Sequence, residues 1–508
     1  MSHSRSENNK IYLRLVLMGV IFYTIIFTSL CSLRYRAFFS YEWEDEAAEN
    51  QILWNTVHGS FLKQTIYETE SGMFIDHFSP IYILISFLYA VVPRIHTLYF
   101  LISFSFAIGA ISLFLLAREI LADSFQACLF AFTYLFYSPL HWINVTTVEP
   151  IMFSIPLLLF AFYFFYKGRF WHFLILLILS LMTKGNISLI IIMFGLYALI
   201  KKKDSKWILL PLSFGIVWYV LSIWVAYPAI GSPNRSPFHG LLFGSPSGIL
   251  RNFILSPGKI LNFMFSYEHL LFLAKVFKPI LFLSFFSLEW LISLPTYLQI
   301  LLITELPGNN WSYSLSPAIP FIFLGLIFSL QYIKRLIWSS ANLRNEIKTA
   351  LMNCLVICVM GSSILSNFGS NMIGFLNDHK IVDRRFESID NIYDMRLYLS
   401  DTDDEIAWDL INRIPKDAPV SASGDLLVPL SHRPKLLEFS FDSVADGGGQ
   451  DYYDVDYILI HKKSVQHGGG QYAPLRKKHL DKIVELIDKY VFTVIAERGD
   501  FILLKKVE

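Results

Sequence analysis

Residues 11–31 read IYLRLVLMGVIFYTIIFTSLC, and residues 41–51 read YEWEDEAAENQ. The first stretch is apolar over the roughly 20 residues that a helical membrane span needs. No small-residue cleavage site follows it, so we expect a retained first span and not a signal peptide. The second stretch gathers five carboxylates beside the end of that span. So much negative charge at a membrane surface is costly unless a metal ion, a metal-bound phosphate or a cationic ligand comes to it.

The composition places the chain among membrane proteins. Of its 508 residues, 54% are hydrophobic and 16% are charged, and the mean hydropathy is +0.48. In a soluble domain about 25% of the residues are charged, so the predicted fold class is a polytopic α-helical membrane protein. The net charge of +1 argues against a nucleic-acid partner. The four cysteines lie in or beside apolar runs and are expected to pack as small apolar residues.

Apolar runs and basic turns together predict about 11 spans. The spans are expected near residues 11–31, 97–117, 124–138, 150–166, 170–183, 186–200, 207–226, 279–294, 296–306, 314–331 and 349–366. Lysines and arginines at 201–206 and 334–348 mark cytoplasmic turns. The sides then alternate correctly only if the run at 79–93, which is short for a span, forms a re-entrant or interface-lying helix.

Two domains follow from this arrangement. A transmembrane domain is expected over residues 1–370, with external loops at 32–96 and 227–278, and a soluble α/β domain over residues 378–508. The second domain is expected to contain helices at 405–414 and 475–490, strands at 419–422 and 456–461, and a hairpin of strands 491–496 and 501–505. The charge count puts this domain outside a plasma (inner) membrane.

The first external loop carries residues that could do chemistry. A helix is expected from Trp43 onward, in which Asp45 and Glu49 lie one turn apart. Asp76 and His77 directly precede the interface helix. Carboxylates and a histidine from separate loops could hold a divalent cation or act as base and acid.

A further, short external loop at 139–149 supplies His141 and Glu149. We predict Asp45, His77 and Glu149 as catalytic residues. Asp45 and Glu149 are also candidate ligands of a magnesium or manganese ion. The alternative for His141 and Glu149 is a polar pair at the membrane interface.

Lys184 interrupts an apolar run and falls at an external helix end. A cation at such a place is a functional candidate and could hold a phosphate; a lysine that snorkels to the interface is the alternative. The residues predicted to bind substrate are Glu49, Asp76, His141, Lys184, Arg235 and Tyr313. Glu42, Glu44 and Glu46 are expected to form a solvated surface.

The same loop contains two specific motifs. Asp45 is followed by a Gln-x-x-Trp-Asn-Thr-x-His-Gly pattern from Gln51 to Gly59 and by Asp-His-Phe-Ser-Pro from Asp76 to Pro80. Further matches are Ile414-Pro415, Val420-Ser421-Ala422-Ser423, Leu430-Ser431-His432-Arg433 and Asp456-Tyr457-Ile458-Leu459. With these residues the chain resembles, over nearly its whole length, a bacterial and archaeal membrane-protein family, domain of unknown function 2079 (DUF2079).

The sequence departs from the family pattern at three places. The family often has aspartate near the position of Asn50, His-Pro in place of Glu149-Pro150, and Lys-Glu-Asp in place of Lys184-Gly185-Asn186. A family-like site would therefore depend on Glu149 and on the acids around Asp45.

This family is in turn similar to integral-membrane glycosyltransferases of the GT-C architecture. Those enzymes carry an acidic first external loop, a short helix at the membrane after it, and a second acid in the next external loop. The resemblance implies transfer of a sugar from a polyprenyl-phosphate donor, held among membrane lipid, to a glycan or protein acceptor at the external face.

The resemblance also implies roles for the site residues. A metal ion, Lys184 or Arg235 would neutralise the leaving phosphate. Asp45 would deprotonate the acceptor hydroxyl or hold the metal, and His77 and Glu149 would complete the site. The C-terminal domain would hold the acceptor or close the cavity.

Two other functions are compatible with such a chain. A transporter of lipids or lipid-linked sugars usually shows internal repeats and helices broken at the midplane; here the charges gather at one interface and no fixed repeat is seen. A non-catalytic membrane anchor for the C-terminal domain would not require an acidic first loop.

Overall fold

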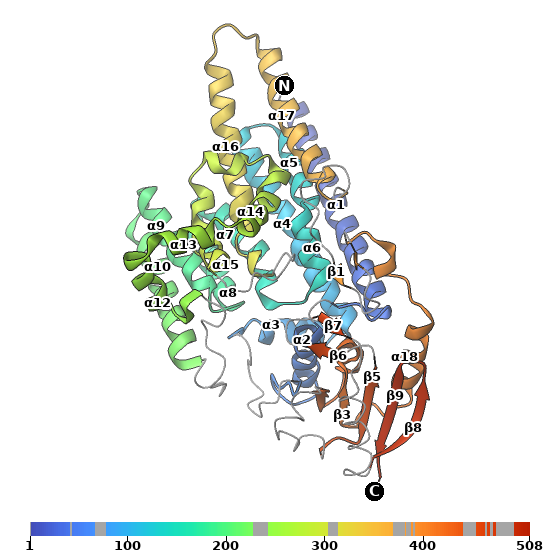
Figure 1. Ribbon diagram of the computed structural model, residues 1–508. Coiled ribbons are helices and arrows are strands. Elements are labelled where there is room, and N and C mark those ends of the chain that lie inside the picture. Colours follow the sequence, from blue (N-terminus) through green and yellow to red (C-terminus); the bar gives the residue numbers. More distant parts are fainter. Residues whose placement is uncertain are drawn as a thin grey trace.

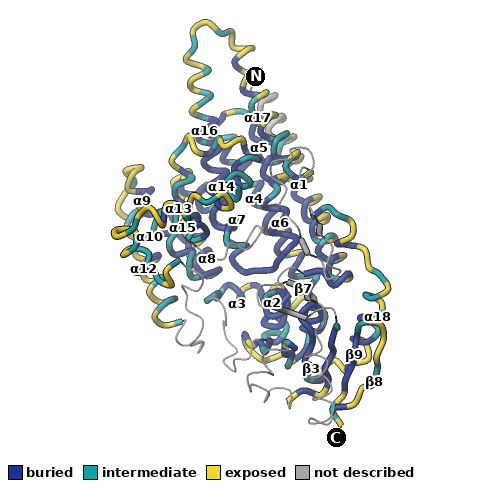
Figure 2. The backbone as a smooth tube through the Cα atoms, in the orientation of Figure 1, coloured by how far each residue is buried: buried dark blue, intermediate teal, exposed yellow. Residues whose placement is uncertain are grey.

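The structure is a computed structural model that describes residues 2–40, 43–66, 78–226, 242–302, 313–368, 381–382, 388–389, 392–439, 454–462, 465–467, 471–473 and 492–507. A bundle of helices forms one end of the molecule and a small β-sheet forms the other (Figure 1). The helices α2 (Trp43–Val57) and α3 (Tyr82–Tyr89) lie between them. Buried residues continue from the bundle through α2 into the sheet (Figure 2).

The bundle contains helices of very different lengths. Its α-helices are α1 (Ser2–Arg36), α4 (Ile95–Leu121), α5 (Ser124–Leu135), α6 (Ser138–Thr146), α7 (Ser154–Tyr166), α8 (Phe170–Leu181), α9 (Ile187–Ile200), α10 (Ser205–Leu221), α12 (Pro246–Leu255), α13 (Pro257–Met264), α14 (Tyr267–Phe277), α15 (Leu294–Leu301), α16 (Ile319–Ser339) and α17 (Asn345–Leu365). Its short 3-10 and π turns are η1 (Pro150–Phe153), η2 (Ser222–Ala226), η3 (Leu242–Gly244), η4 (Lys278–Ile280), η5 (Leu283–Phe286), η6 (Glu289–Ser293) and η7 (Tyr313–Leu315).

Fewer helices than expected are long enough to cross a membrane. Among the described residues the candidates are Lys10–Arg36, Ile95–Leu121, Ser205–Ala226, Ile319–Ser339 and Asn345–Leu365. A sixth crossing would be the pair Pro257–Met264 and Tyr267–Ile280, which is bent by 49° and overlaps the predicted external loop 227–278. The prediction of about 11 spans is therefore not confirmed.

Part of the difference has a physical cause. The predicted span at 279–294 and the described part of the one at 296–306 form only η4, η5, η6 and the eight-residue α15. Pro279 and Pro295 lie at the starts of two of these elements, and proline can neither donate a backbone hydrogen bond nor continue a helix that precedes it. Hydropathy alone counts such a segment as a span, because it does not register where the helix breaks.

The basic turns gather at one end of the bundle. Lys167 Nζ lies 3.0 Å from Glu119 Oε1, and Lys334 donates to the carbonyl of Leu121. Lys203 Nζ lies 5.0 Å from the centre of a phenylalanine ring in the last turn of α7. The charge bias predicts that this end is cytoplasmic, so that α2 and the sheet would be external.

Helix α3, which lies within the predicted external loop 32–96, is too short to form a span. α3 has only eight residues, about 12 Å of helix, and lies beside α2 (Figure 1). Its start is bonded to the turn after α8: Ser79 Oγ donates to the carbonyl of Thr183 at 2.8 Å, and the Ile81 amide donates to that of Met182 at 3.0 Å. The length of α3 is below the roughly 20 residues of a span, and the re-entrant or interface-lying helix within 79–93 stays a prediction.

The C-terminal region forms the α/β fold that its sequence predicts. Strands β3 (Val420–Ala422), β4 (Leu436–Glu438), β5 (Tyr457–His461), β8 (Phe492–Arg498) and β9 (Phe501–Lys506) form a sheet of order β4-β3-β5-β9-β8. The β4-β3-β5 part is parallel and the β5-β9-β8 part is antiparallel. The strands predicted at 419–422 and 456–461 and the predicted hairpin are thus confirmed.

The connections of this region are also partly as predicted. The helix predicted at 405–414 is α18 (Thr402–Asn412), which begins with a capping box between Asp401 and Asp404. The turn after β3 contains η9 (Gly424–Leu426) and α19 (Leu427–Leu430), and η8 (Met395–Leu397) precedes α18. Two short ribbons, β1 (Ile381–Val382) with β2 (Ser388–Ile389) and β6 (Val465–His467) with β7 (Gln471–Ala473), complete the described strands. The helix predicted at 475–490 lies outside the described residues.

Candidate functional site

A buried cation meets a buried acid at the end of the bundle that faces α2. Glu149 has extended backbone before Pro150, the conformation that a following proline favours. Lys184 lies in the turn between α8 and α9, and its Nζ is 3.7 Å from Glu149 Oε2. The two residues are 8% and 2% exposed. At this distance the two groups form an ion pair but not a hydrogen bond.

Tyr313 completes the surroundings of the lysine. Lys184 Nζ lies 4.4 Å from the centre of the Tyr313 ring, a cation–π distance. Tyr313 begins η7, which packs against η1 directly after Glu149. Three segments far apart in the sequence therefore meet at the lysine.

The acidic helix α2 brings further carboxylates to the same place. Burial raises the pKa of Glu49 well above its ordinary value, and the nearby carboxylates of Glu149 and Asp45 raise it further. Lys184 acts in the opposite direction but does not offset them. Glu49 Oε2 is buried and accepts no hydrogen bond from a described residue. Such surroundings favour the protonated form of a carboxyl group, which can exchange its proton with a substrate.

Five of the predicted site residues thus lie together: Asp45, Glu49, Glu149, Lys184 and Tyr313. We call them the acid–lysine group. Asp76, His77 and Arg235 lie outside the described residues. Ser79, two positions after His77, is bonded beside Lys184.

His141 belongs to a different network. Its Nδ1 lies 2.9 Å from Asn367 Oδ1 and 2.6 Å from the hydroxyl of Tyr393, and its Nε2 contacts the carbonyl of Leu135. Its ring also packs at 4.6 Å from that of Phe27. Burial lowers the pKa of His141 to about 4. These contacts fasten α6 to α1 and to the segment after α17, and no described contact joins His141 to the acid–lysine group.

Glu46 corrects the expectation of a solvated acidic surface. Its carboxylate is 0% exposed and accepts two hydrogen bonds from the Arg34 guanidinium, at 2.9 and 3.1 Å. It also accepts a hydrogen bond from Ser40 at 2.6 Å and one from the hydroxyl of Tyr99. The sequence feature that could have indicated this buried ion pair is Arg34, which lies in the last turn of α1 with Glu46 12 residues further along the chain.

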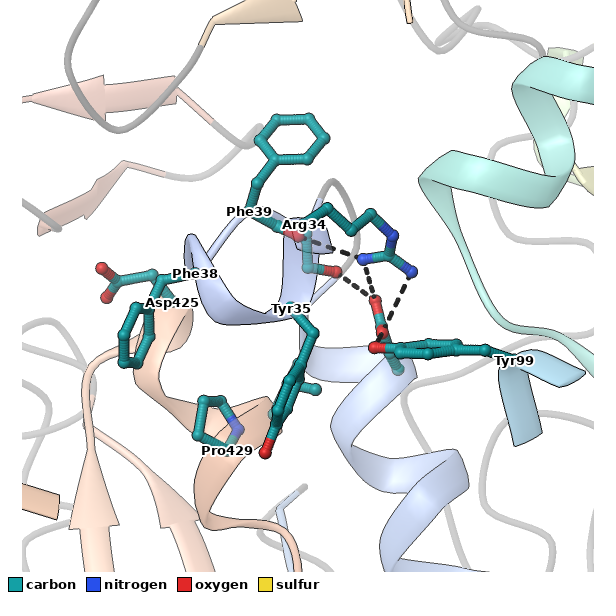
Figure 3. A pocket seen from close by; sticks show the side chains of 10 residues that line it. Arg34, Tyr35, Phe38, Phe39, Tyr99, Asp425 and Pro429 are labelled. Atoms are coloured by element: carbon teal, nitrogen blue, oxygen red, sulfur yellow. Dashed lines mark hydrogen bonds and ion pairs between the residues drawn. The ribbon is translucent and has the colours of Figure 1, made fainter. Parts of the chain in front are cut away.

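A small pocket lies beside this buried pair (Figure 3). It is bounded by the end of α1, the start of α2, Tyr99 of α4, and Asp425 and Pro429 of the C-terminal region. Its volume of about 10 Å³ is enough for one water molecule. The pocket is therefore a junction between the domains and too small for a lipid or a sugar.

A metal site is not complete among these side chains. The described residues contain no group of three or more His, Cys, Asp or Glu side chains placed to hold a metal ion. A magnesium or manganese ion at Asp45 and Glu149 thus remains a prediction.

Comparison with known proteins identifies a family. The family described as "Predicted membrane protein (DUF2079)" matches residues 45–496. Comparison with functionally curated proteins gives no match.

Two solved structures of ArnT from Cupriavidus metallidurans are similar in extent. The one bound to undecaprenyl phosphate is 12% identical, with 95% of this chain and 98% of that chain covered and a TM-score of 0.49. The apo structure is 13% identical, with 95% and 97% covered and a TM-score of 0.47. With TM-scores below 0.5, neither structure assigns any chemistry to this chain.

Proposed function

Because the chain belongs to the DUF2079 family of membrane proteins, and because its acidic helix meets a buried lysine, we propose that it is an integral-membrane glycosyltransferase. It would move a sugar from a polyprenyl-phosphate donor to a glycan or protein acceptor at the external membrane face. The observation that carries the proposal is the acid–lysine group, in which Lys184 pairs with the buried Glu149 and both act electrostatically on the half-buried Glu49 beside Asp45.

The group contains the parts that such a transfer requires. The acceptor hydroxyl attacks the anomeric carbon of the sugar, a new carbon–oxygen bond forms, and the bond from that carbon to the phosphate oxygen breaks. The proton of the hydroxyl passes to a carboxylate, for which Asp45 is the proposed base. The polyprenyl phosphate leaves with the bonding electron pair.

The lysine serves the leaving group. Lys184 is a compact cation inside a poorly solvated site, where it stabilises developing phosphate charge more strongly than it would in water. Glu149 and the Tyr313 ring hold its ammonium group in place. Glu49, whose pKa is raised, would hydrogen-bond the sugar while protonated.

Asp45 and Glu149 are also the proposed residues that would hold a magnesium or manganese ion, which would supply additional stabilisation of the phosphate charge. His77, Asp76 and Arg235 are proposed to reach the same substrate from the first and second external loops. The plasma (inner) membrane, with the C-terminal domain outside, is the proposed location.

The test is a transfer assay on the purified full chain in lipid vesicles. A panel of labelled polyprenyl-phosphate sugars is offered with membrane glycan extracts as acceptors, and labelled products are counted. Asp45→Asn should lower the transfer rate by at least about 100-fold, the usual contribution of a general base. Its thermal midpoint should equal that of the wild-type protein.

Glu405→Gln, which changes an exposed acid of α18, is the matched control and should transfer normally. Full transfer by a folded Asp45→Asn variant would remove Asp45 from the mechanism. Movement of the labelled lipid across the vesicle membrane, without transfer and unaffected by Asp45→Asn, would identify a transporter instead.

A further inference from the structure

Helix α2 has two opposite faces with different partners. Successive residues of an α-helix are about 100° apart, so Asp45 and Glu49 lie about 40° apart, while Trp43 and Trp54 lie about 160° and 180° from Asp45. The first face carries Asp45 and Glu49 on the side of Glu149 and Lys184. The second packs against η9 and α19 of the C-terminal region.

The central contact between the helix and this region is a set of buried polar side chains. Asn50, which is 0% exposed, donates from Nδ2 to Ser431 Oγ at 2.7 Å. Its Oδ1 accepts a hydrogen bond from the Tyr89 hydroxyl at 2.8 Å. The same hydroxyl lies 3.1 Å from Nε2 of His432. We call Asn50, Tyr89, Ser431 and His432 the docking hub.

The hydrogens of the docking hub can be assigned. The Ser431 hydroxyl donates to the carbonyl of Val428 at 2.7 Å, so its oxygen accepts from Asn50. The Tyr89 hydroxyl gives its only hydrogen to Asn50, so the hydrogen between Tyr89 and His432 must come from Nε2 of the histidine. Burial, followed by the nearby cationic side chains, lowers the pKa of His432 to about 4. The ring is thus neutral at neutral pH, and each of the four hub side chains has at least one hydrogen-bond partner within the hub.

Two further contacts leave α2 little freedom to rotate. Gln51 Nε2 donates to the carbonyl of Arg433 at 3.0 Å, and Gln51 Oε1 accepts from the Thr65 amide at 2.8 Å. A Cβ atom at Gly424 would lie only 2.1 Å from Nε1 of Trp43. The C-terminal region therefore packs against the helix more closely than any side chain at position 424 allows.

Helix α3 extends the contact to the lysine. Tyr89 is its last residue, and its other end is bonded through Ser79 and Ile81 to the turn that carries Lys184. One short helix thus connects the docking hub to the cation, while α2 connects the hub to the acids.

We propose that the C-terminal domain is a positioning element of the active site. Through the docking hub it sets the rotation of α2 and the place of α3, and so the placement of Asp45 and Glu49 relative to Lys184. The hub residues are positioning residues and do not touch the substrate. The catalytic role of Asp45 and Glu49 in this inference rests on the proposed function. The contact through which the C-terminal domain positions α2 and α3 does not depend on it.

Two variants act on the link from opposite sides. Tyr89→Phe removes one hydroxyl from the hub, and Gly424→Ala forces the C-terminal domain away from Trp43. The matched controls are Tyr332→Phe, on an exposed tyrosine of α16, and Gly361→Ala, where an added Cβ meets nothing within 4 Å.

The first readout is the transfer reaction of the full chain in vesicles. A displacement of the acids by about 1 Å should lower kcat by roughly 100-fold, while KM for donor and acceptor stays within about threefold. The controls should match the wild-type protein. A rise in acceptor KM at unchanged kcat would overturn the inference, because the domain would then bind the acceptor and not position the acids.

The second readout does not need transfer. A membrane-soluble carbodiimide is added at pH 7 and modification of Glu49 is measured by mass spectrometry. We expect modification of Glu49 to change several-fold in Tyr89→Phe and Gly424→Ala and in neither control. Unchanged modification in folded Tyr89→Phe protein would overturn the inference, whether or not Gly424→Ala folds. If the two variants change the modification of Glu49 but the wild-type protein itself transfers no sugar, the inference stands and only the proposed function is refuted.

Discussion

Glu46 and Glu49 lie one turn apart on α2, yet their surroundings are opposite. The carboxylate of Glu46 accepts hydrogen bonds at both oxygens, from Arg34, Ser40 and Tyr99. Glu49 has a buried oxygen that accepts none from the described residues, and it lies among other acids.

The difference teaches how to separate a structural acid from a reactive one. A buried charge whose hydrogen-bonding capacity is fully used is fixed in place and cannot accept a substrate without losing stability. A buried carboxyl group with a raised pKa, and with an oxygen that accepts no hydrogen bond from the described residues, can form that hydrogen bond with a substrate. Substitutions at Glu46, His141, Lys184 and Glu49 test this contrast.

The largest effect is expected from Glu46→Gln. The substitution leaves the Arg34 guanidinium buried without a counter-charge, which typically costs 3–5 kcal/mol, that is, roughly 4 kcal/mol of unfolding free energy. Denaturant unfolding of the purified protein in detergent would measure it. The double variant Arg34→Met with Glu46→Leu should recover most of the loss, and equal stability of wild type and Glu46→Gln would contradict the structural role.

His141 should behave like Glu46 and not like Glu49. Its pKa is about 4 when folded and about 6.5 when unfolded, so the unfolded chain binds the proton more tightly. Stability should therefore fall as the pH drops from 6.5 towards 4, by up to about 3 kcal/mol. In His141→Gln the slope of unfolding free energy against pH should be flatter over this window, with transfer at pH 7.5 retained. An unchanged slope would show that His141 is not held neutral by burial.

An intermediate effect is expected from Lys184→Met. Loss of a charge-assisted contact to the donor phosphate is worth about 1.5–3 kcal/mol, so KM for the donor should rise by roughly 10- to 100-fold. Lys416→Met, at an exposed lysine of the C-terminal domain, is the control. A donor KM equal in both variants would place the phosphate elsewhere.

The smallest expected effect is the change in unfolding free energy caused by Glu49→Gln. The raised pKa of Glu49 means that the folded protein binds this proton more tightly than the unfolded chain. The associated stabilisation is full below the ordinary value of 4.5 and is lost as the pH rises through the folded-state pKa. Glu49→Gln should thus be more stable than wild type at pH 8 by about 1 kcal/mol, although transfer is impaired. A loss of stability at that pH would assign Glu49 to the structural class with Glu46.

Much of the fold could be predicted from local patterns. The acidic helix after the first span, the short helix within 79–93 and the strands at 419–422 and 456–461 all depend on short-range periodicity and turn residues. The span count could not, because hydropathy registers neither the short lengths of α5, α7, α8 and α9 nor the helix breaks at Pro279 and Pro295.

Some members of the acid–lysine group could be found where charge interrupts an apolar pattern. Lys184 stands out inside a hydrophobic run and Asp45 beside a span, and in the structure both act electrostatically on Glu49. The partition between Glu46 and Glu49 was not predictable, because it depends on Arg34 and Tyr99, which approach from other helices. The roles of Asn50 and Ser431 were equally hidden, since 381 positions separate them in the sequence.

The most direct test compares carbodiimide modification of the two glutamates at pH 7 in the wild-type protein, with and without an added polyprenyl phosphate. Glu49, whose pKa is raised, should react with the carbodiimide, and Glu46, whose carboxylate is enclosed by Arg34, Ser40 and Tyr99, should not. The polyprenyl phosphate should protect Glu49 by occupying the site beside Lys184. Equal modification of the two residues, or modification of Glu49 that the lipid phosphate leaves unchanged, would contradict the account.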